Sequence, residues 1–370
     1  MGYFAIAVDA DKRDDFENTV KYFQLAADMG NVPALKTLAG FYEEGYGPLD
    51  RDIKKAVQLY AKAADLGSAK ALFKVGCYFK DIVGEKEGKQ KAVQLFSRSI
   101  QNGGKKAITA LGQCYEDGIG VPQNIAKAIE LYQAAMGKGN GLAAVCLGLC
   151  YDSGKGLPRN KERAAEMYKR GYDLGEVLGA YNLGVCYRDG TGVPQSTEKA
   201  IELFKAGANM GHGQSAYALG VLYKDGTLVP RDMEKVIGYY SLAGELGHAE
   251  SIVDLGLIYH LGDGVPKDPK KAVKMFAIAA DMGNTSAMSN LAICLKNGIG
   301  TEKDLDKAIA LLVRSASLGN PLAMFNLGGC FRDGTGVPKD IEKALEYFQL
   351  AAQRGYGPAQ KICQENGLNY

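Results

Sequence analysis

A glycine recurs along this chain at an almost constant interval of 36 residues. Leucine or valine precedes it in each copy. The residues at this position are Ala39, Gly76, Gly112, Gly148, Gly184, Gly220, Gly256, Ala292 and Gly328. The first interval is 37 residues and the other seven are 36 residues. A period of this length is typical of solenoids, in which one helical unit cannot bury a core alone and stacks on its neighbours.

Each copy of the repeat has the pattern of two helices joined by a short turn. In the third copy, Ala107, Leu111 and Tyr115 recur at the spacing of one helix face. Gly118 and Pro122 then end that helix and begin an extended turn. The second helix starts at a column of residues that favour helix N-caps. This column contains Asp52, Asn124, Asn160, Ser196, Asp232, Asp268, Asp304 and Asp340. The pattern predicts an all-α fold, an α/α superhelix or solenoid of stacked 36-residue helix-turn-helix repeats.

The composition fits an ordered array. Glycine accounts for 48 of the 370 residues, about twice the usual share, but most of these glycines occupy fixed positions in the repeat. The period favours one elongated array over the two or three domains that the length alone would suggest. We expect an N-terminal extension at residues 1–16, a half-repeat at 17–31, nine full repeats at 32–355 and a half-repeat cap at 356–370.

The repeated pattern Ala-x-x-x-Leu-Gly-x-x-Tyr-x-x-Gly-x-Gly-Val resembles the Sel1-like repeat family, close kin of the tetratricopeptide repeats. The resemblance continues in Asp/Asn-x-x-Lys-Ala and Tyr-x-x-Ala-Ala-x-x-Gly. The ninth copy is nearly complete, with Ala323, Leu327, Gly328, Phe331, Gly334, Gly336, Val337, Asp340, Lys343, Ala344, Phe348, Ala351, Ala352 and Gly355. The resemblance covers about residues 17–364. It implies a non-catalytic adaptor or scaffold for protein–protein interaction.

Three copies depart from the pattern. Residues 82–88 replace the glycine-rich loop of the second copy, and Leu228 replaces a loop glycine in the sixth. Ala292, Leu295 and Thr301 are the variant positions of the eighth copy. Since loops accept substitution readily, we expect these changes to alter the superhelix only locally.

Five of the eight cysteines share one apolar column of the repeat, two residues after the recurring glycine. They are Cys114, Cys150, Cys186, Cys294 and Cys330. Equivalent positions on packed helices lie about 8–10 Å apart, whereas disulfides need Cα atoms about 4.4–6.8 Å apart. We therefore expect these cysteines to act as small hydrophobic residues without disulfides.

The sequence contains little that suggests catalysis. The three histidines, His212, His248 and His260, are not spaced as metal ligands, so neither a metal nor a cofactor is expected. Ser196 and Lys199 match the Ser-x-x-Lys string of penicillin-recognising enzymes, but its companion motifs are absent. We interpret Ser196 as a helix N-cap, and a hydrolase of that type is the less favoured alternative.

Charge and hydropathy limit the kinds of partner and the cellular compartment that we expect for this protein. The net charge of +2 argues against nucleic acid as a partner, although a helical-repeat protein that binds nucleic acid remains an alternative. No apolar run is long enough to cross a membrane, and the N-terminus lacks the features of a signal peptide. We expect a cytoplasmic protein; a trimmed secreted or ER-lumenal form would have the same sequence features.

The resemblance places the first helix of each repeat on the concave, binding side of the array. Variable residues in these columns combine aromatic rings with charges that are mainly basic in the C-terminal half. The expected partner-binding residues are Phe73, Tyr181, Asn182, Arg188, Tyr217, Lys224, Lys296, Phe325, Asn326 and Arg332. They predict a protein or extended peptide partner of acidic character. The alternative is that the aromatic rings pack between helices and the charges only face solvent.

Overall fold

The computed structural model describes residues 2–47, 49–81 and 86–370. These residues form 21 helices and no strand, apart from an isolated bridge between Tyr46 and Leu49. The predicted all-α fold of stacked helix pairs is therefore confirmed. Residues 82–85 of the variant second loop lie outside the described residues. The chain divides into two compact units, residues 1–195 and 196–370.

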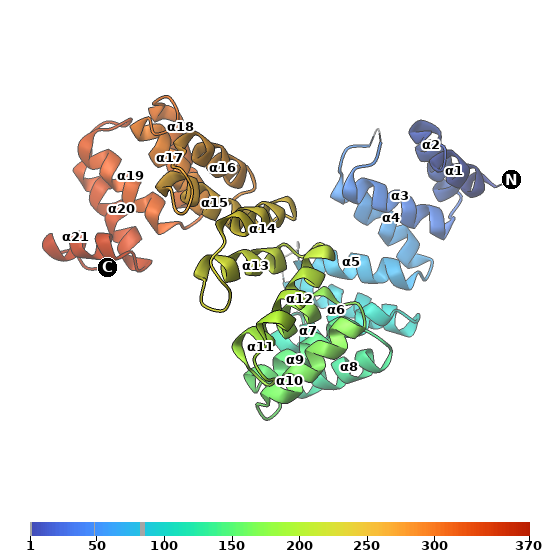
Figure 1. Cartoon of the computed structure of the whole chain (residues 1–370). Helices are drawn as coiled ribbons and strands as arrows, with labels where there is room; N and C mark the ends of the chain where they lie inside the picture. The colour runs from blue at the N-terminus through green and yellow to red at the C-terminus, as the bar shows by residue number, and fades with distance from the viewer. Residues whose placement is uncertain (1, 48, 82–85) are drawn as a thin grey trace. The chain divides into compact units, whose positions relative to one another are not determined.

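Consecutive helices pack against one another within each unit (Figure 1). The first unit contains α1 (Tyr3–Asp11), α2 (Phe16–Asp28), α3 (Val32–Glu44), α4 (Ile53–Asp65), α5 (Ala69–Asp81), α6 (Lys86–Gln101), α7 (Lys105–Asp117), α8 (Ile125–Gly137), α9 (Gly141–Ser153), α10 (Lys161–Asp173) and α11 (Val177–Asp189). The second unit contains α12 (Thr197–Asn209), α13 (Gly213–Asp225), α14 (Met233–Glu245), α15 (Ala249–Leu261), α16 (Pro269–Asp281), α17 (Thr285–Asn297), α18 (Leu305–Ser317), α19 (Pro321–Asp333), α20 (Ile341–Gln353) and α21 (Gly357–Glu365). The repeat boundaries given above stay a prediction.

The N-terminal extension contains a helix that the repeat pattern did not predict. Helix α1 packs on α2, and Phe4 lies edge-on against Phe23 with the ring centroids 5.6 Å apart. Tyr3 stacks on Tyr22 at a centroid distance of 6.1 Å. The apolar residues of this segment therefore cover the open side of the first half-repeat, the role that a capping element has in a solenoid.

The N-cap column of the second helices forms the predicted hydrogen bonds. Each side chain accepts a hydrogen bond from the backbone N–H three residues further on, as between Asn124 Oδ1 and Lys127 N at 3.0 Å. Ser196 Oγ accepts from Lys199 N at 3.3 Å. These bonds satisfy donors that the first helical turn leaves unpaired. The structure thus gives Ser196 the N-cap position predicted for it.

The recurring glycine lets an aromatic ring of the second helix lie against the backbone of the first. A Cβ atom at Gly112 would lie 2.6 Å from Tyr132 Cε1, and one at Gly328 would lie 2.8 Å from Phe348 Cε1. Both rings are almost fully buried. Ala292 replaces glycine in the repeat where the smaller Leu312 replaces the ring. Ala39, in the repeat whose loop is one residue longer, is an exception and retains an aromatic partner.

A second glycine column joins consecutive repeats. Gly120 has a φ of +71°, and a Cβ there would lie 2.2 Å from Lys89 O in the helix of the preceding repeat. Gly300 has a φ of +70°, and a Cβ there would lie 2.2 Å from Pro269 O. Only glycine combines this left-handed backbone with such a close approach. The two columns therefore serve different contacts, one within a repeat and one between repeats.

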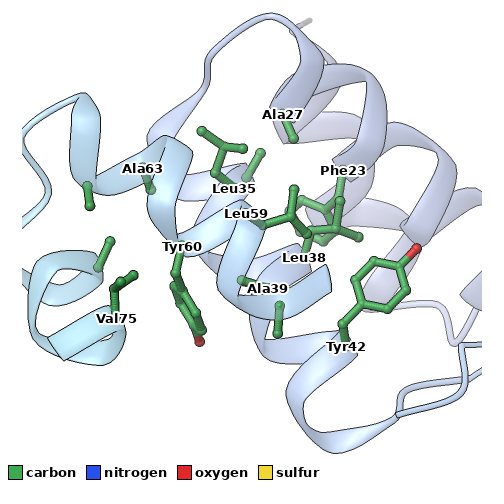
Figure 2. Packing of buried hydrophobic residues seen from close by; sticks show 14 of the residues in the cluster. Phe23, Ala27, Leu35, Leu38, Ala39, Tyr42, Leu59, Tyr60, Ala63 and Val75 are labelled. Atoms are coloured by element: carbon green, nitrogen blue, oxygen red, sulfur yellow. The ribbon is translucent and has the colours of Figure 1, made fainter. Parts of the chain in front are cut away.

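The core of the first unit illustrates how the repeats pack. Figure 2 shows Leu35, Leu38 and Leu59 gathered beside Phe23, with Tyr60 further along the same cluster. These residues come from three successive helices, α2, α3 and α4. No helix pair encloses them alone, because each apolar face is completed by the next helix.

The cysteines behave as the packing column predicts. All eight are free thiols, and each is buried except Cys77, which is half-buried. Burial raises the pKa of the Cys114 thiol to about 11 and that of Cys146 to about 12. They therefore fill the core as neutral side chains at physiological pH.

Candidate functional site

A cleft in the second unit brings together four of the predicted binding residues. It has a volume of about 420 Å³ and lies along α17 and α19. Lys296 comes from the last turn of α17, while Phe325, Asn326 and Arg332 come from α19. The first helices of consecutive repeats are neighbours. Lys296 and Arg332, which occupy the same position of the repeat 36 residues apart, therefore line one cleft. The volume lies in the range of small-ligand and peptide side-chain pockets.

Seven further described residues line the cleft and were not predicted, among them Lys303, Asp333 and Thr335. Lys303 and Thr335 come from the loops after α17 and α19, and Asp333 follows Arg332 at the end of α19. The prediction considered only columns on the first helices, so it could not include the loops. The recurring Arg-Asp-Gly string at the end of α11 and α19 was a usable signal for Asp333.

The cleft carries an excess of positive charge. Arg332 donates from Nε to Asp333 Oδ1 at 2.8 Å and from Nη2 to Asp333 Oδ2 at 3.0 Å. The hydrogen bond from Arg332 holds the pKa of the Asp333 carboxyl below its usual value. This pair is half exposed, so solvent screens it. Lys296 and Lys303 add two positive charges that Asp333 does not balance.

The apolar part of the cleft is fixed by ring packing. The Phe325 ring lies 5.4 Å from that of Phe348 and 5.1 Å from that of Tyr356, measured between centroids. Asn326 Nδ2 donates to Leu322 O at 2.8 Å, a bond within its own helix. Phe325 therefore has a fixed orientation, and its partly exposed face is available to a ligand.

The other predicted residues of the second unit lie on α13. Tyr217 donates from its hydroxyl to Asp254 Oδ2 at 2.9 Å, and its ring stacks on His248 at 4.6 Å. It also stacks on Tyr240, with the centroids 5.1 Å apart. Lys224 is half-buried near the end of the same helix. At Tyr217 the geometry fits the alternative interpretation, in which the ring packs between helices.

The remaining predicted residues belong to the first unit. Tyr181, Asn182 and Arg188 lie half-buried on α11. Arg188 donates to both carboxylate oxygens of Asp189 at 2.7 and 2.8 Å. Phe73 lies on α5, with its ring centroid 5.9 Å from that of Phe96, and lines another cleft. The structure therefore groups four of the ten residues in one cleft, and their role in binding stays a prediction.

Two acidic residues on the first helices, Glu43 and Glu116, form ion pairs with lysines. Glu43 accepts from Lys74 Nζ at 2.8 Å and from the Tyr60 hydroxyl at 3.0 Å. Burial raises the pKa of Glu43, but these two bonds and the Lys74 charge outweigh it, so the pKa lies below its usual value. Glu116 accepts in the same way from Lys155 Nζ at 2.9 Å and from the Tyr132 hydroxyl at 2.6 Å.

The described residues contain no group of three or more histidine, cysteine or carboxylate side chains placed to hold a metal ion. His248 instead accepts a hydrogen bond at Nδ1 from Ser251 N at 3.2 Å, as the N-cap of α15. Within residues 2–47, 49–81 and 86–370, every helix is too short or too polar to cross a lipid bilayer.

Comparison with known proteins identifies the repeat. The family model of the Sel1 repeat matches residues 10–31, 36–68, 69–104, 105–140, 142–176, 177–212, 213–248, 249–284, 285–320 and 321–356. Comparison with curated protein sequences finds no match.

Solved structures agree with this assignment. A crystal structure of a protective antigen present in uropathogenic Escherichia coli strains, displaying an SLR fold, is similar at 29% identity with a TM-score of 0.55. That match covers 93% of this chain and 73% of the antigen chain. A Sel1 repeat protein from Oxalobacter formigenes is similar at 26% identity and a TM-score of 0.60, covering 83% of this chain and 90% of its own. The chain belongs to the Sel1 repeat family.

Proposed function

We propose that this protein is a non-catalytic scaffold that binds an acidic, extended segment of a partner protein on its first helices. Sel1 repeat proteins are generally protein-interaction scaffolds and typically lack catalysis. The observation that carries the specific proposal is the convergence of Lys296, Lys303 and Arg332 beside Phe325 in one cleft of about 420 Å³. A positively charged cleft with an aromatic floor suits carboxylates flanking an apolar side chain.

Each residue has a definite part in this binding. Lys296 and Lys303 attract carboxylates, and the attraction steers encounter as well as strengthening the complex. Phe325 supplies an apolar surface that its neighbours Phe348 and Tyr356 already hold in place, so little side-chain entropy is lost on contact. Arg332 exchanges part of its interaction with Asp333 for a carboxylate of the partner.

The probe for this proposal is a fluorescein-labelled peptide rich in glutamate, with one central benzoylphenylalanine that crosslinks to nearby residues on irradiation. Affinity is measured by fluorescence anisotropy, and the crosslinked residues are mapped by mass spectrometry. We expect crosslinks on α19 around Phe325. The double variant Lys296→Glu and Arg332→Glu should weaken binding at this site by about tenfold or more, since like charges then face the peptide.

The matched control is the double variant Lys274→Glu and Arg314→Glu. It makes the same change in net charge on exposed residues of α16 and α18 that do not line the cleft. The control should retain the crosslinks to α19. If both double variants weaken binding equally, the effect comes from overall charge and the cleft is not the binding site.

A further inference from the structure

A second cleft, in the first unit, has the properties of a ligand site, and of the ten predicted binding residues only Phe73 lines it. It has a volume of about 520 Å³ and is bounded by α5, α7, the start of α9 and the turn before α11. Four lysines line it: Lys80, Lys105, Lys106 and Lys138. Among the residues that the structure describes, Glu176 is the only acidic one in this lining.

Two of these lysines occupy an unusual position. Lys105 and Lys106 are the first residues of α7, whose N-cap, Gly104, forms no side-chain capping bond, and the first turn contains no acidic residue. A helix N-terminus carries partial positive charge, so two lysines there repel it. Among the residues that the structure describes, Lys105, Lys106 and Lys138 form no ion pair. Among the described residues, Glu176 is the only carboxylate in the lining beside these lysines, so their positive charge is offset only in part.

An independent observation comes from Thr109. This residue lines the cleft one helical turn after the two lysines, and only 1% of it is exposed. Its hydroxyl has no hydrogen-bond partner among the described residues. A buried hydroxyl without a partner costs free energy. An acceptor supplied by a ligand in the cleft would remove that cost, and a carboxylate is such an acceptor.

The rest of the lining identifies the kind of ligand. Phe73, Ala110 and Leu142 give the cleft an apolar part, which an apolar side chain can fill. Glu176 accepts hydrogen bonds but repels anions, so it suits a ligand that also has N–H donors. A peptide backbone has such donors, whereas a phosphodiester backbone has none.

We infer that this cleft binds a peptide segment that carries carboxylates next to a bulky apolar side chain. Lys105, Lys106 and Lys138 take the carboxylates, and Thr109 donates its hydroxyl to one of them. The apolar side chain lies against Phe73 and Leu142. This site shares no residue with the cleft on α17 and α19, so either site can fail without the other.

The test uses the full chain and the glutamate-rich benzoylphenylalanine peptide. We expect crosslinks on α5, α7 and α9 around Phe73, Ala110 and Leu142. The double variant Lys105→Glu and Lys106→Glu should remove these crosslinks while leaving those on α19. The control, Lys54→Glu with Lys62→Glu on exposed positions of α4, makes the same change in charge and should leave both sets intact.

The variant Thr109→Val is the sharper test, because valine has nearly the same shape and lacks the hydroxyl. It should raise the midpoint temperature of unfolding and weaken peptide binding at this cleft by about two- to tenfold. If Thr109 were only a core residue, the variant would raise the midpoint temperature and leave the peptide affinity unchanged. Unchanged peptide affinity in Thr109→Val, or unchanged crosslinks in the lysine double variant, would overturn the proposal.

Competition separates the peptide from other anions. Inorganic phosphate and a short oligouridine are each added to the labelled peptide. We expect neither to displace it from α7 at concentrations where an unlabelled peptide of the same sequence does. Displacement by oligouridine, with a steep dependence on salt, would assign the cleft to nucleic acid instead.

Discussion

Two adjacent glycines of α19 allow the role of the repeated glycine to be measured. Gly328 belongs to the recurring column, and a Cβ there would lie 2.8 Å from Phe348 Cε1 and 3.1 Å from Ala344 O. At Gly329, one position further on the same helix, a Cβ would have nothing within 4 Å. The variants Gly328→Ala and Gly329→Ala therefore differ mainly in this contact.

The expected effects have opposite signs. Alanine is better than glycine in a helix by about 0.5–1 kcal/mol, so Gly329→Ala should stabilise the second unit by that amount. Gly328→Ala gains the same propensity but forces the buried Phe348 ring away from a contact that needs about 3.5 Å. Overpacking of this kind costs about 1–3 kcal/mol. Gly328→Ala should therefore be less stable than Gly329→Ala by about 1–3 kcal/mol.

The measurement is native-state amide hydrogen exchange, which reports the opening free energy of α19 and α20 separately from the rest of the chain. The double variant Gly328→Ala and Phe348→Leu reproduces the pair Ala292 and Leu312 found two helices earlier. It should recover part of the loss of Gly328→Ala, because the smaller side chain leaves room for the Cβ. If Gly328→Ala protects α19 and α20 as well as Gly329→Ala does, ring packing is not the reason for glycine at this position.

Three further predictions concern caps, ion pairs and thiols. Asn124→Ala should lower the free energy of unfolding by about 1 kcal/mol, measured by urea denaturation, because it removes the hydrogen bond to the first turn of α8. Lys74→Gln should raise the pKa of Glu43, measured by NMR titration of the carboxyl group. Because that pKa is lowered in the folded state, the ion pair stabilises the fold fully above about pH 4.5, the ordinary pKa of a glutamate. This contribution is lost as the pH falls through the lowered pKa. An unchanged Glu43 titration would contradict the assigned contact. Iodoacetamide should label the half-buried Cys77 well before the buried Cys146, measured by mass spectrometry, and equal rates would show that burial does not control these thiols.

Sequence reasoning succeeded where one residue type repeats for one physical reason. The N-cap column needs a short polar side chain at one register position, so Asn124 and its equivalents could be assigned from spacing. The first helices mix several residue types at the same position. Asn140 caps α9 by accepting from Ala143 N, whereas Gly104 precedes α7 without a capping bond. Because the residue type varies from repeat to repeat, the sequence did not reveal the N-cap position of the first helices, which the structure shows.

The candidate site was partly predictable for a related reason. A 36-residue period places equivalent positions of consecutive first helices beside each other, so Lys296 and Arg332 could be expected to lie close together. The recurring Arg-Asp-Gly string drew attention to Asp333 but did not predict its bond to Arg332, because adjacent residues on a helix usually point in different directions. Both residues lie in the last turn of α19, directly before the C-cap Gly334. The position of the loop residue Thr335 in the cleft could not be predicted, because it depends on how that loop folds.

The two glycine columns also separate two quantities that are usually entangled in repeat proteins. In a nearest-neighbour description, the stability of an array is the sum of an intrinsic term for each repeat and a coupling term for each interface. Gly328 meets a ring of its own repeat, so its substitution changes the intrinsic term. Gly300 meets the backbone of the preceding repeat, so its substitution changes the coupling. Substitution of Gly300 should thus broaden the unfolding transition of the second unit, while substitution of Gly328 mainly shifts it, and cooperativity can be tuned independently of local stability.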